Sequence, residues 1–119
     1  IDIFITEYLA SKRNVVIDLS FSFAGECWLW QAEKAAWHFV TMPKKMSEEI
    51  SFFNENISVK KRGWGSVRVK ATIGETTWET SLFPQAKEGT FILPIKADVR
   101  KKEKIVVGSE VHVSLVVNL

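Results

Sequence analysis

The chain has 119 residues, of which 46% are hydrophobic and 25% charged, and its formal net charge is +2. This length predicts one domain over residues 1–119, the apolar content excludes a disordered chain, and the small charge does not by itself favour nucleic acid. The single cysteine, Cys27, cannot form an internal disulfide, and no apolar run approaches the roughly 18 residues of a membrane span. Residues 1–14 also lack the pattern of a signal peptide, so we expect a cytoplasmic protein without a membrane partner.

The first third of the chain predicts a β-hairpin. Residues 1–14 fit either a strand or a helix, with a strand favoured, and residues 15–23 alternate apolar and polar side chains as a half-buried strand does. Gly25 interrupts this alternation and predicts a bulge, after which the strand resumes at Cys27–Trp30.

The return strand of this hairpin runs over Trp37–Met42, after a short loop at 31–36, and Pro43 ends it because proline cannot donate to the ladder. We expect Trp30 and Trp37, which flank the loop, to lie in the core with most of the other tryptophans. This expectation follows from the size of the indole, whose burial contributes strongly to stability.

Residues 44–57 change to a helical period. Met46, Ile50, Phe53 and Ile57 fall on one helical stripe, and Ser47 is the expected N-cap. A basic loop with glycines, Lys60–Gly65, leads onward.

The most regular pattern in the chain is at residues 66–83. Residues 66–73 alternate strictly, and the pair Gly74-Glu75 suits a type II′ turn, because glycine accepts a positive φ there. This turn fixes a register in which Ala71 faces Trp78 inside the fold and Lys70 faces Glu79 outside it. The same register places Ser81 beside Arg68.

The last third of the chain predicts a buried strand at Thr90–Ile95, a short basic helix at Lys96–Glu103, a turn at Gly108 and a final strand at 110–119. With the earlier elements this gives six or seven strands and two short helices, without a βαβ repeat. The pattern is typical of a mainly β protein, either an antiparallel barrel or a sandwich.

Three strings carry a resemblance to a known family: AAWHFVTMP at 35–43, RGWGSVRVKATIGETTWETSLFP at 62–84, and ILPIKADVRKKEKIVVGSEVHVSL at 92–115. They resemble a family of bacterial domains catalogued as domain of unknown function 1905. The resemblance implies a small antiparallel barrel of the double-split type and implies no activity, because the family has none established. Barrels of that type include dimeric DNA binders, which is an analogy of fold alone.

The residues that could carry chemistry do not form a catalytic set. His38, His112 and Cys27 lie on separate predicted strands, and their spacing does not predict a zinc site. Cys27 activated by His38, or Ser81, could act as a nucleophile, but Ser81 lacks the G-x-S-x-G elbow and Cys27 has apolar neighbours. We therefore expect no cofactor and no enzymatic activity.

Two basic segments, Lys60–Lys70 and Lys96–Lys104, offer an alternative function. With Trp64 and Trp78 between them they could bind single-stranded nucleic acid through charge and stacking. Interspersed glutamates and aspartates favour an ordinary solvated surface instead.

The function expected from the sequence is a non-catalytic binding or interaction module for a small anionic ligand or a protein. Arg100 is the principal candidate, because it follows a buried strand and a proline, and its planar guanidinium suits a carboxylate. Its structural alternatives are a bond to loop carbonyls or a pair with Glu79. The expected site consists of Arg62, Trp64, Ser81, Lys96 and Arg100.

Overall fold

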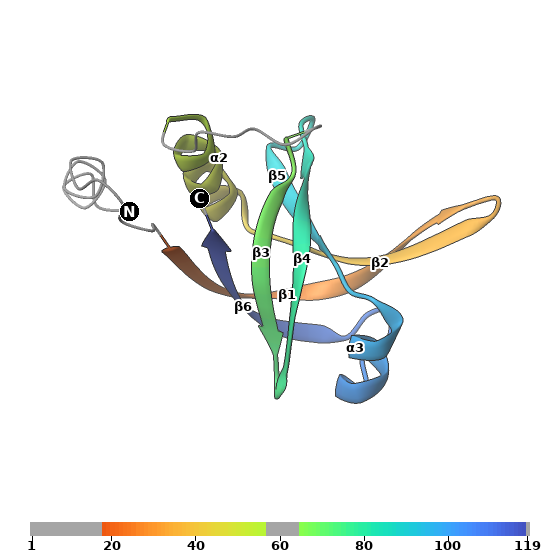
Figure 1. The fold of residues 1–119 in the computed structure, drawn as a ribbon. Coiled ribbons are helices and arrows are strands. Elements are labelled where there is room, and N and C mark those ends of the chain that lie inside the picture. The colour runs from red at the N-terminus through yellow and green to blue at the C-terminus, as the bar shows by residue number, and fades with distance from the viewer. Residues whose placement is uncertain (1–17, 57–64, 119) are drawn as a thin grey trace.

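The computed structural model describes residues 18–56 and 65–118. Its strands and helices are β1 (Asp18–Ala32), β2 (Ala35–Thr41), α2 (Lys44–Asn56), β3 (Val67–Ile73), β4 (Thr76–Gln85), β5 (Thr90–Pro94), α3 (Ala97–Glu103) and β6 (Glu110–Asn118). The six described strands close into an antiparallel barrel in the order β1-β2-β5-β4-β3-β6 (Figure 1). The mainly β barrel with two helices that the sequence predicts is confirmed, whereas Arg62, Trp64 and the interpretations of residues 1–17 and 57–64 lie outside the described part.

Strand β1 belongs to both halves of the barrel. It pairs with β6 over Asp18–Glu26 and with β2 over Cys27–Ala32. Every residue of β1 lies opposite one residue of a partner strand, without the extra residue that a bulge inserts. The bulge expected at Gly25 is therefore wrong. A Cβ atom at Gly25 would lie 2.7 Å from Val40 Cγ1, so glycine is needed there because β2 crosses closely.

The hairpin of β3 and β4 has the register that the sequence predicts. Ala71 faces Trp78, Lys70 faces Glu79, and Gly74 has φ +59°, as the first position of a type II′ turn requires. Ala71 and Trp78 are both buried. The smallest apolar side chain of β3 therefore packs opposite the largest of β4.

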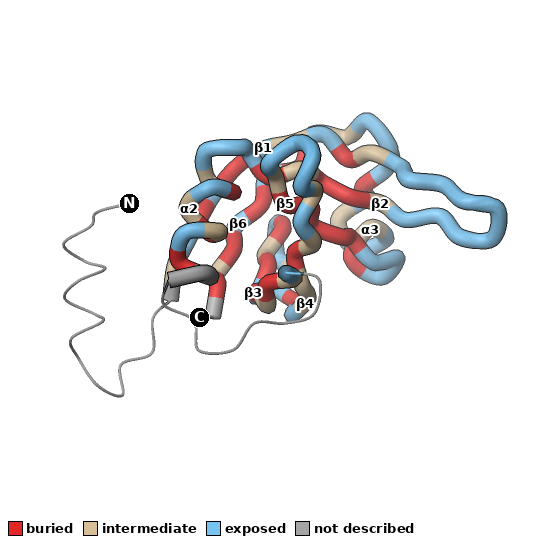
Figure 2. Tube along the Cα trace, turned by 90° about the horizontal axis from the view of Figure 1, so that it is seen from above, coloured by how far each residue is buried: buried red, intermediate tan, exposed pale blue. Residues whose placement is uncertain are grey.

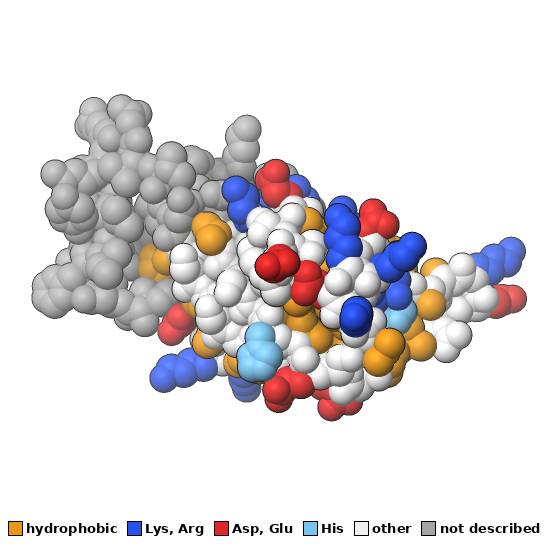
Figure 3. Space-filling model, turned by 90° about the horizontal axis from the view of Figure 1, so that it is seen from below, with side chains coloured by type: hydrophobic (Ala, Val, Ile, Leu, Met, Phe, Trp, Pro, Cys, Tyr) orange, Lys and Arg blue, Asp and Glu red, His pale blue; other side chains and the backbone are white. Residues whose placement is uncertain are grey.

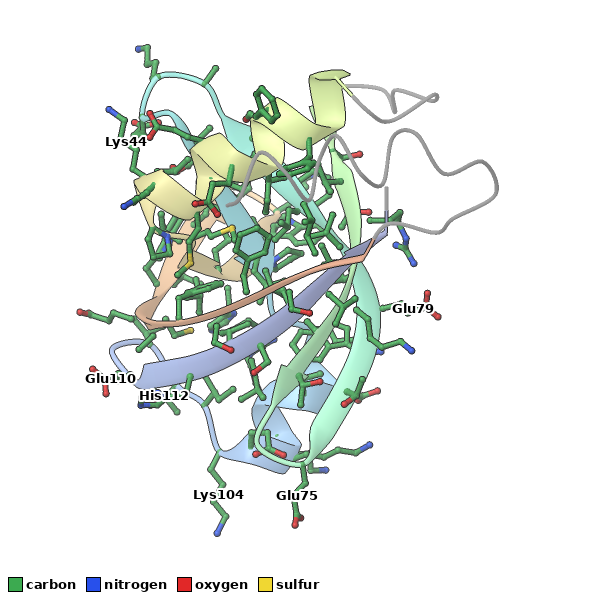
Figure 4. All side chains as sticks on the ribbon, turned by 90° about the vertical axis from the view of Figure 1, so that its left-hand side faces the viewer. Lys44, Glu75, Glu79, Lys104, Glu110 and His112 are labelled. Carbon is green, nitrogen blue, oxygen red and sulfur yellow. The ribbon has the colours of Figure 1, made fainter. Side chains whose placement is uncertain are left out.

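The core fills the inside of this barrel (Figure 4). The inward residues of β6, Val111, Val113, Leu115 and Val117, are at most 2% exposed, which confirms the alternation predicted for the last strand. Strand β5 is buried along most of its length, also as predicted.

Helix α2 covers one end of the barrel (Figure 1) and begins earlier than its expected N-cap. It starts at Lys44, so Ser47 lies inside the helix and is only 1% exposed. The Ser47 hydroxyl donates to the backbone oxygen of Met42, at 3.4 Å, and accepts from the N–H of Phe91, at 3.0 Å. The N-cap prediction is wrong: this serine instead connects α2 to β5.

Replacing Ser47 with alanine is expected to lower the free energy of unfolding by about 1–3 kcal/mol, because the N–H of Phe91 stays buried without a partner. Urea denaturation measures the loss. Ser51→Ala on the same helix is the matched control and should change stability by less than about 0.5 kcal/mol. Equal effects of the two substitutions would contradict the assigned bond.

The hairpin of β1 and β2 extends beyond the barrel as an exposed arm, coloured pale blue in Figure 2. Trp30 and Trp37 face one another across it and are 47% and 51% exposed. The prediction that these two tryptophans lie in the core is therefore wrong. Trp37 stacks on Phe39, with ring centroids 6.3 Å apart, at the base of the arm.

Candidate functional site

A pocket of about 430 Å³ opens at the side of the barrel between β4, β2 and the start of α3. It lies beyond the point where β5 stops pairing with β4, at Phe83–Gln85, while β5 continues beside β2 as far as Ile95, whose N–H donates to the carbonyl of His38 at 2.9 Å. We call it the Arg100 pocket. Its polar lining residues are His38, Arg68, Glu79, Thr80, Ser81, Lys96 and Arg100.

The structure brings together three residues of the expected site. Ser81, Lys96 and Arg100 all line the Arg100 pocket. Arg62 and Trp64 lie outside the described residues. The pocket also contains residues that the sequence analysis did not assign to it, Trp37, His38, Arg68, Trp78 and Phe83 among them.

Arg100 is held in place by the backbone that precedes its helix. The side-chain Nε of Arg100 donates to the carbonyl of Ile95, at 3.1 Å. Its backbone N–H donates to the carbonyl of Lys96, also at 3.1 Å. The bond to Ile95 is the loop-carbonyl contact considered as one alternative for this residue. No ion pair joins Arg100 to Glu79 or to another described residue. The bond to Ile95 uses only Nε, and neither Nη group makes a hydrogen bond or ion pair with a described residue, so both are available to a ligand.

Positive charge prevails around the pocket. Arg68, Lys96 and Arg100 line it with one carboxylate, that of Glu79. Arg68 Nη1 donates to Ser81 Oγ at 3.3 Å, which joins the two residues that the hairpin register places opposite each other. Figure 4 shows Glu79 pointing away from the barrel, and Figure 3 shows Lys and Arg side chains near the base of the arm, beside hydrophobic ones. The pocket therefore favours an anion over a cation.

His38 carries less positive charge at neutral pH than an ordinary histidine does. Burial lowers the pKa of its imidazole, and the nearby Arg100 charge lowers it further. Its Nδ1 is buried and makes no hydrogen bond with any described residue. His38 therefore does not activate Cys27 through that nitrogen.

Cys27 lies inside the barrel and is fully buried. Burial raises the pKa of its thiol. The positive charge of Arg100 lowers this pKa, but by less than burial raises it. A nucleophilic cysteine has a lowered pKa and an accessible sulfur, so this environment is that of an unreactive thiol.

We expect native protein at pH 8 to resist a thiol reagent that labels Cys27 completely in denaturant. Because the pKa of the thiol is higher in the folded chain than in the unfolded chain, folding favours the protonated thiol. This contribution to stability is complete below the unfolded pKa of about 8.5 and is lost as pH rises through the folded pKa. Cys27→Ala should remove this dependence of stability on pH. Rapid labelling of Cys27 in native protein would contradict its assignment as an unreactive thiol.

The other candidate residues are dispersed. His112 is exposed and lies 3.3 Å from the exposed carboxylate of Glu110. The described residues contain no group of three or more histidines, cysteines, aspartates or glutamates that could hold a metal ion. Lys101 and Lys102 on α3, and Lys104 directly after it, are exposed outside the pocket.

Neither described helix, of 13 and 7 residues, has the length and apolar character that a membrane span requires. A comparison with curated proteins gives no match. A comparison with protein families matches residues 23–115 to the family described as Domain of unknown function (DUF1905), a range that includes every strand of the barrel at least in part. The chain belongs to this family, as its tryptophan, glycine and proline motifs predict.

Proposed function

We propose that this domain is a non-catalytic binding module that takes an anionic ligand in the Arg100 pocket. The observation that carries the proposal is the guanidinium of Arg100. The bond from Nε to Ile95 fixes its position, and its Nη groups remain unpaired among the described residues. A guanidinium fixed in this way loses little entropy when it binds a carboxylate or phosphate with two parallel bonds.

The surrounding residues support the same ligand chemistry. Lys96 and Arg68 add positive charge, while Trp37 and Phe83 add apolar surface. Ser81 already accepts a hydrogen bond from Arg68, and the thiol of Cys27 is buried in its protonated form. These features suit the recognition of a ligand and do not supply an activated nucleophile.

An NMR titration of the ¹⁵N-labelled chain with succinate and with inorganic phosphate tests the proposal. We expect saturable shifts of the backbone amides of Ser81, Lys96 and Arg100, with small shifts at exposed residues that do not line the pocket, such as His112. Equal shifts over the whole surface, or no shifts up to about 50 mM ligand, near the weak limit of specific binding, would contradict it.

Nucleic-acid binding is the second candidate, and one observation favours it. Arg68 comes from the first basic segment and Lys96 and Arg100 from the second, and all three line one pocket beside exposed Trp37. A gel-shift assay with single-stranded oligonucleotides over a salt series tests this function. Retardation that weakens steeply with salt would support it, and no retardation at low salt would remove it.

A further inference from the structure

Strand β4 has an edge whose backbone groups are directed away from β3. In a hairpin with a two-residue loop the residues that flank the loop form a hydrogen-bonded pair, and such pairs recur at every second residue. Ile73 and Thr76 flank this loop, so Glu79 and Ser81 fall between the hydrogen-bonded pairs. Their N–H and C=O groups therefore point to the opposite side of β4.

No described strand pairs with that side of β4 between Thr76 and Leu82, because β5 joins it only at Phe83–Gln85. Helix α3 approaches the far end of this edge, where the Thr76 hydroxyl donates to Glu103 at 2.6 Å. Between these two contacts, Glu79, Thr80 and Ser81 form one wall of the Arg100 pocket. The pocket therefore contains an open strand edge.

An open edge of this kind accepts an added strand, which is a general mode of peptide recognition. Glu79 and Ser81 together present two N–H donors and two C=O acceptors, which about three extended residues can match. A nucleic acid has no backbone with this alternation of donors and acceptors. The edge therefore favours a peptide over an oligonucleotide.

The side chains around the edge define what such a peptide should carry. Lys96 and Arg100 lie across the pocket from β4 and complement a carboxylate. Trp37, half exposed and stacked on Phe39, offers a flat apolar surface at the same opening. A short extended peptide with a carboxylate and a hydrophobic side chain satisfies the backbone edge, the charge and the aromatic surface together.

We propose that the ligand of the Arg100 pocket is an extended peptide that adds to β4 at Glu79 and Ser81 and directs a carboxylate to Arg100. This inference rests on the proposed anion-binding function and adds the class of ligand. The carboxylate is the C-terminus of the peptide or an acidic side chain.

Calorimetric titration of the full chain tests the inference with matched peptides. The probes are acetyl-Val-Thr-Val with a free C-terminus, its C-terminal amide, acetyl-Val-Thr-Val-Glu-amide, and two N-methylated forms of the first peptide, one methylated at both valines and one at the threonine. We expect the first peptide to bind at least about tenfold more tightly than acetate, and N-methylation in the matching register to remove that gain, because it removes two backbone hydrogen bonds. The two amide peptides decide whether a terminal or a side-chain carboxylate is preferred.

Two results would separate this inference from the function on which it rests. If both N-methylated forms bind as tightly as the parent peptide while succinate still binds, strand addition is overturned and the anion site stands. If none of the peptides, succinate or phosphate binds, the proposed function itself fails. Tighter binding of a thymidine oligonucleotide than of any peptide would also overturn the inference.

The protein offers a complementary pair of substitutions at Ser81. Ser81→Pro removes the N–H at the open edge, whereas Ser81→Ala removes the same hydroxyl and keeps that N–H. Since the N–H of Ser81 points away from β3, the proline variant should keep the hairpin, which circular dichroism checks. We expect the proline variant to bind the first peptide at least about fivefold more weakly than the alanine variant, and equal affinities would contradict the inference. The N-methylated peptides test the same bonds if the proline variant does not fold.

Discussion

Replacing Trp78 with alanine is expected to lower the free energy of unfolding by about 3–5 kcal/mol, a large part of the stability of a small domain. Trp78 is 8% exposed and packs opposite Ala71, which is fully buried. Because the side chain of Ala71 is only a methyl group, it cannot fill the cavity that removal of the Trp78 indole leaves between the two strands. Guanidinium denaturation followed by far-UV circular dichroism measures the loss.

Trp30 supplies the matched control, since it also lies in a strand but is 47% exposed on the arm. Trp30→Ala should change the free energy of unfolding by less than about 1 kcal/mol. Equal losses for the two substitutions would show that the arm contributes to the core, or that the hairpin of β3 and β4 has a different register. Either result would contradict the described fold.

Replacing Arg100 with glutamine is expected to weaken the binding of succinate or phosphate by roughly tenfold or more, equivalent to about 1.5–3 kcal/mol. The substitution removes the positive charge and both Nη groups of a residue that lines the pocket. It also removes the bond from Nε to Ile95, so a loss of about 1 kcal/mol in the free energy of unfolding is expected with it. NMR titration measures the affinity, and thermal unfolding measures the stability.

Lys101→Gln is the control for Arg100→Gln, because it makes the same change of charge on the same helix at an exposed position outside the pocket. It should leave the affinity within about twofold. Equal weakening by both variants would indicate attraction by overall charge. Unfolding of the Arg100 variant, with tight anion binding by the protein that remains folded, would assign Arg100 a structural role only.

The part of the fold that could be predicted from sequence depends on local pattern. Strict alternation on both sides of Gly74 determines which residues face inward, and the type II′ turn determines which residues are opposite. A one-residue shift would have exposed Trp78 to water. This is why the register, the burial of Trp78 and the contact between Arg68 and Ser81 could all be derived before the structure.

The errors arise where the local pattern is the same for two different tertiary arrangements. An alternating strand with tryptophans fits a barrel wall as well as the base of a projecting arm, so Trp30 and Trp37 could not be placed. Ser47 satisfies the residue preference of an N-cap, yet the partner of its hydroxyl, Phe91, lies on a strand distant in sequence. Neither outcome is encoded within a short window of sequence.

The candidate site was only partly predictable for the same reason. Lys96 and Arg100 follow a buried strand and a proline, which marks the exit of the chain toward a barrel opening. Trp37 and His38 reach that opening because β1 changes partner from β6 to β2 at Cys27. That change of partner is a property of the closed barrel and is not visible in the sequence of β2.

A crystal structure of the chain grown with succinate is the most direct test of the central claim, that the barrel holds an anion against Arg100. We expect one carboxylate of succinate within hydrogen-bonding distance of the Arg100 Nη groups, in the space between Lys96 and Ser81. Succinate bound only to the exposed lysines of α3, with the Arg100 pocket empty at a saturating concentration, would contradict the claim.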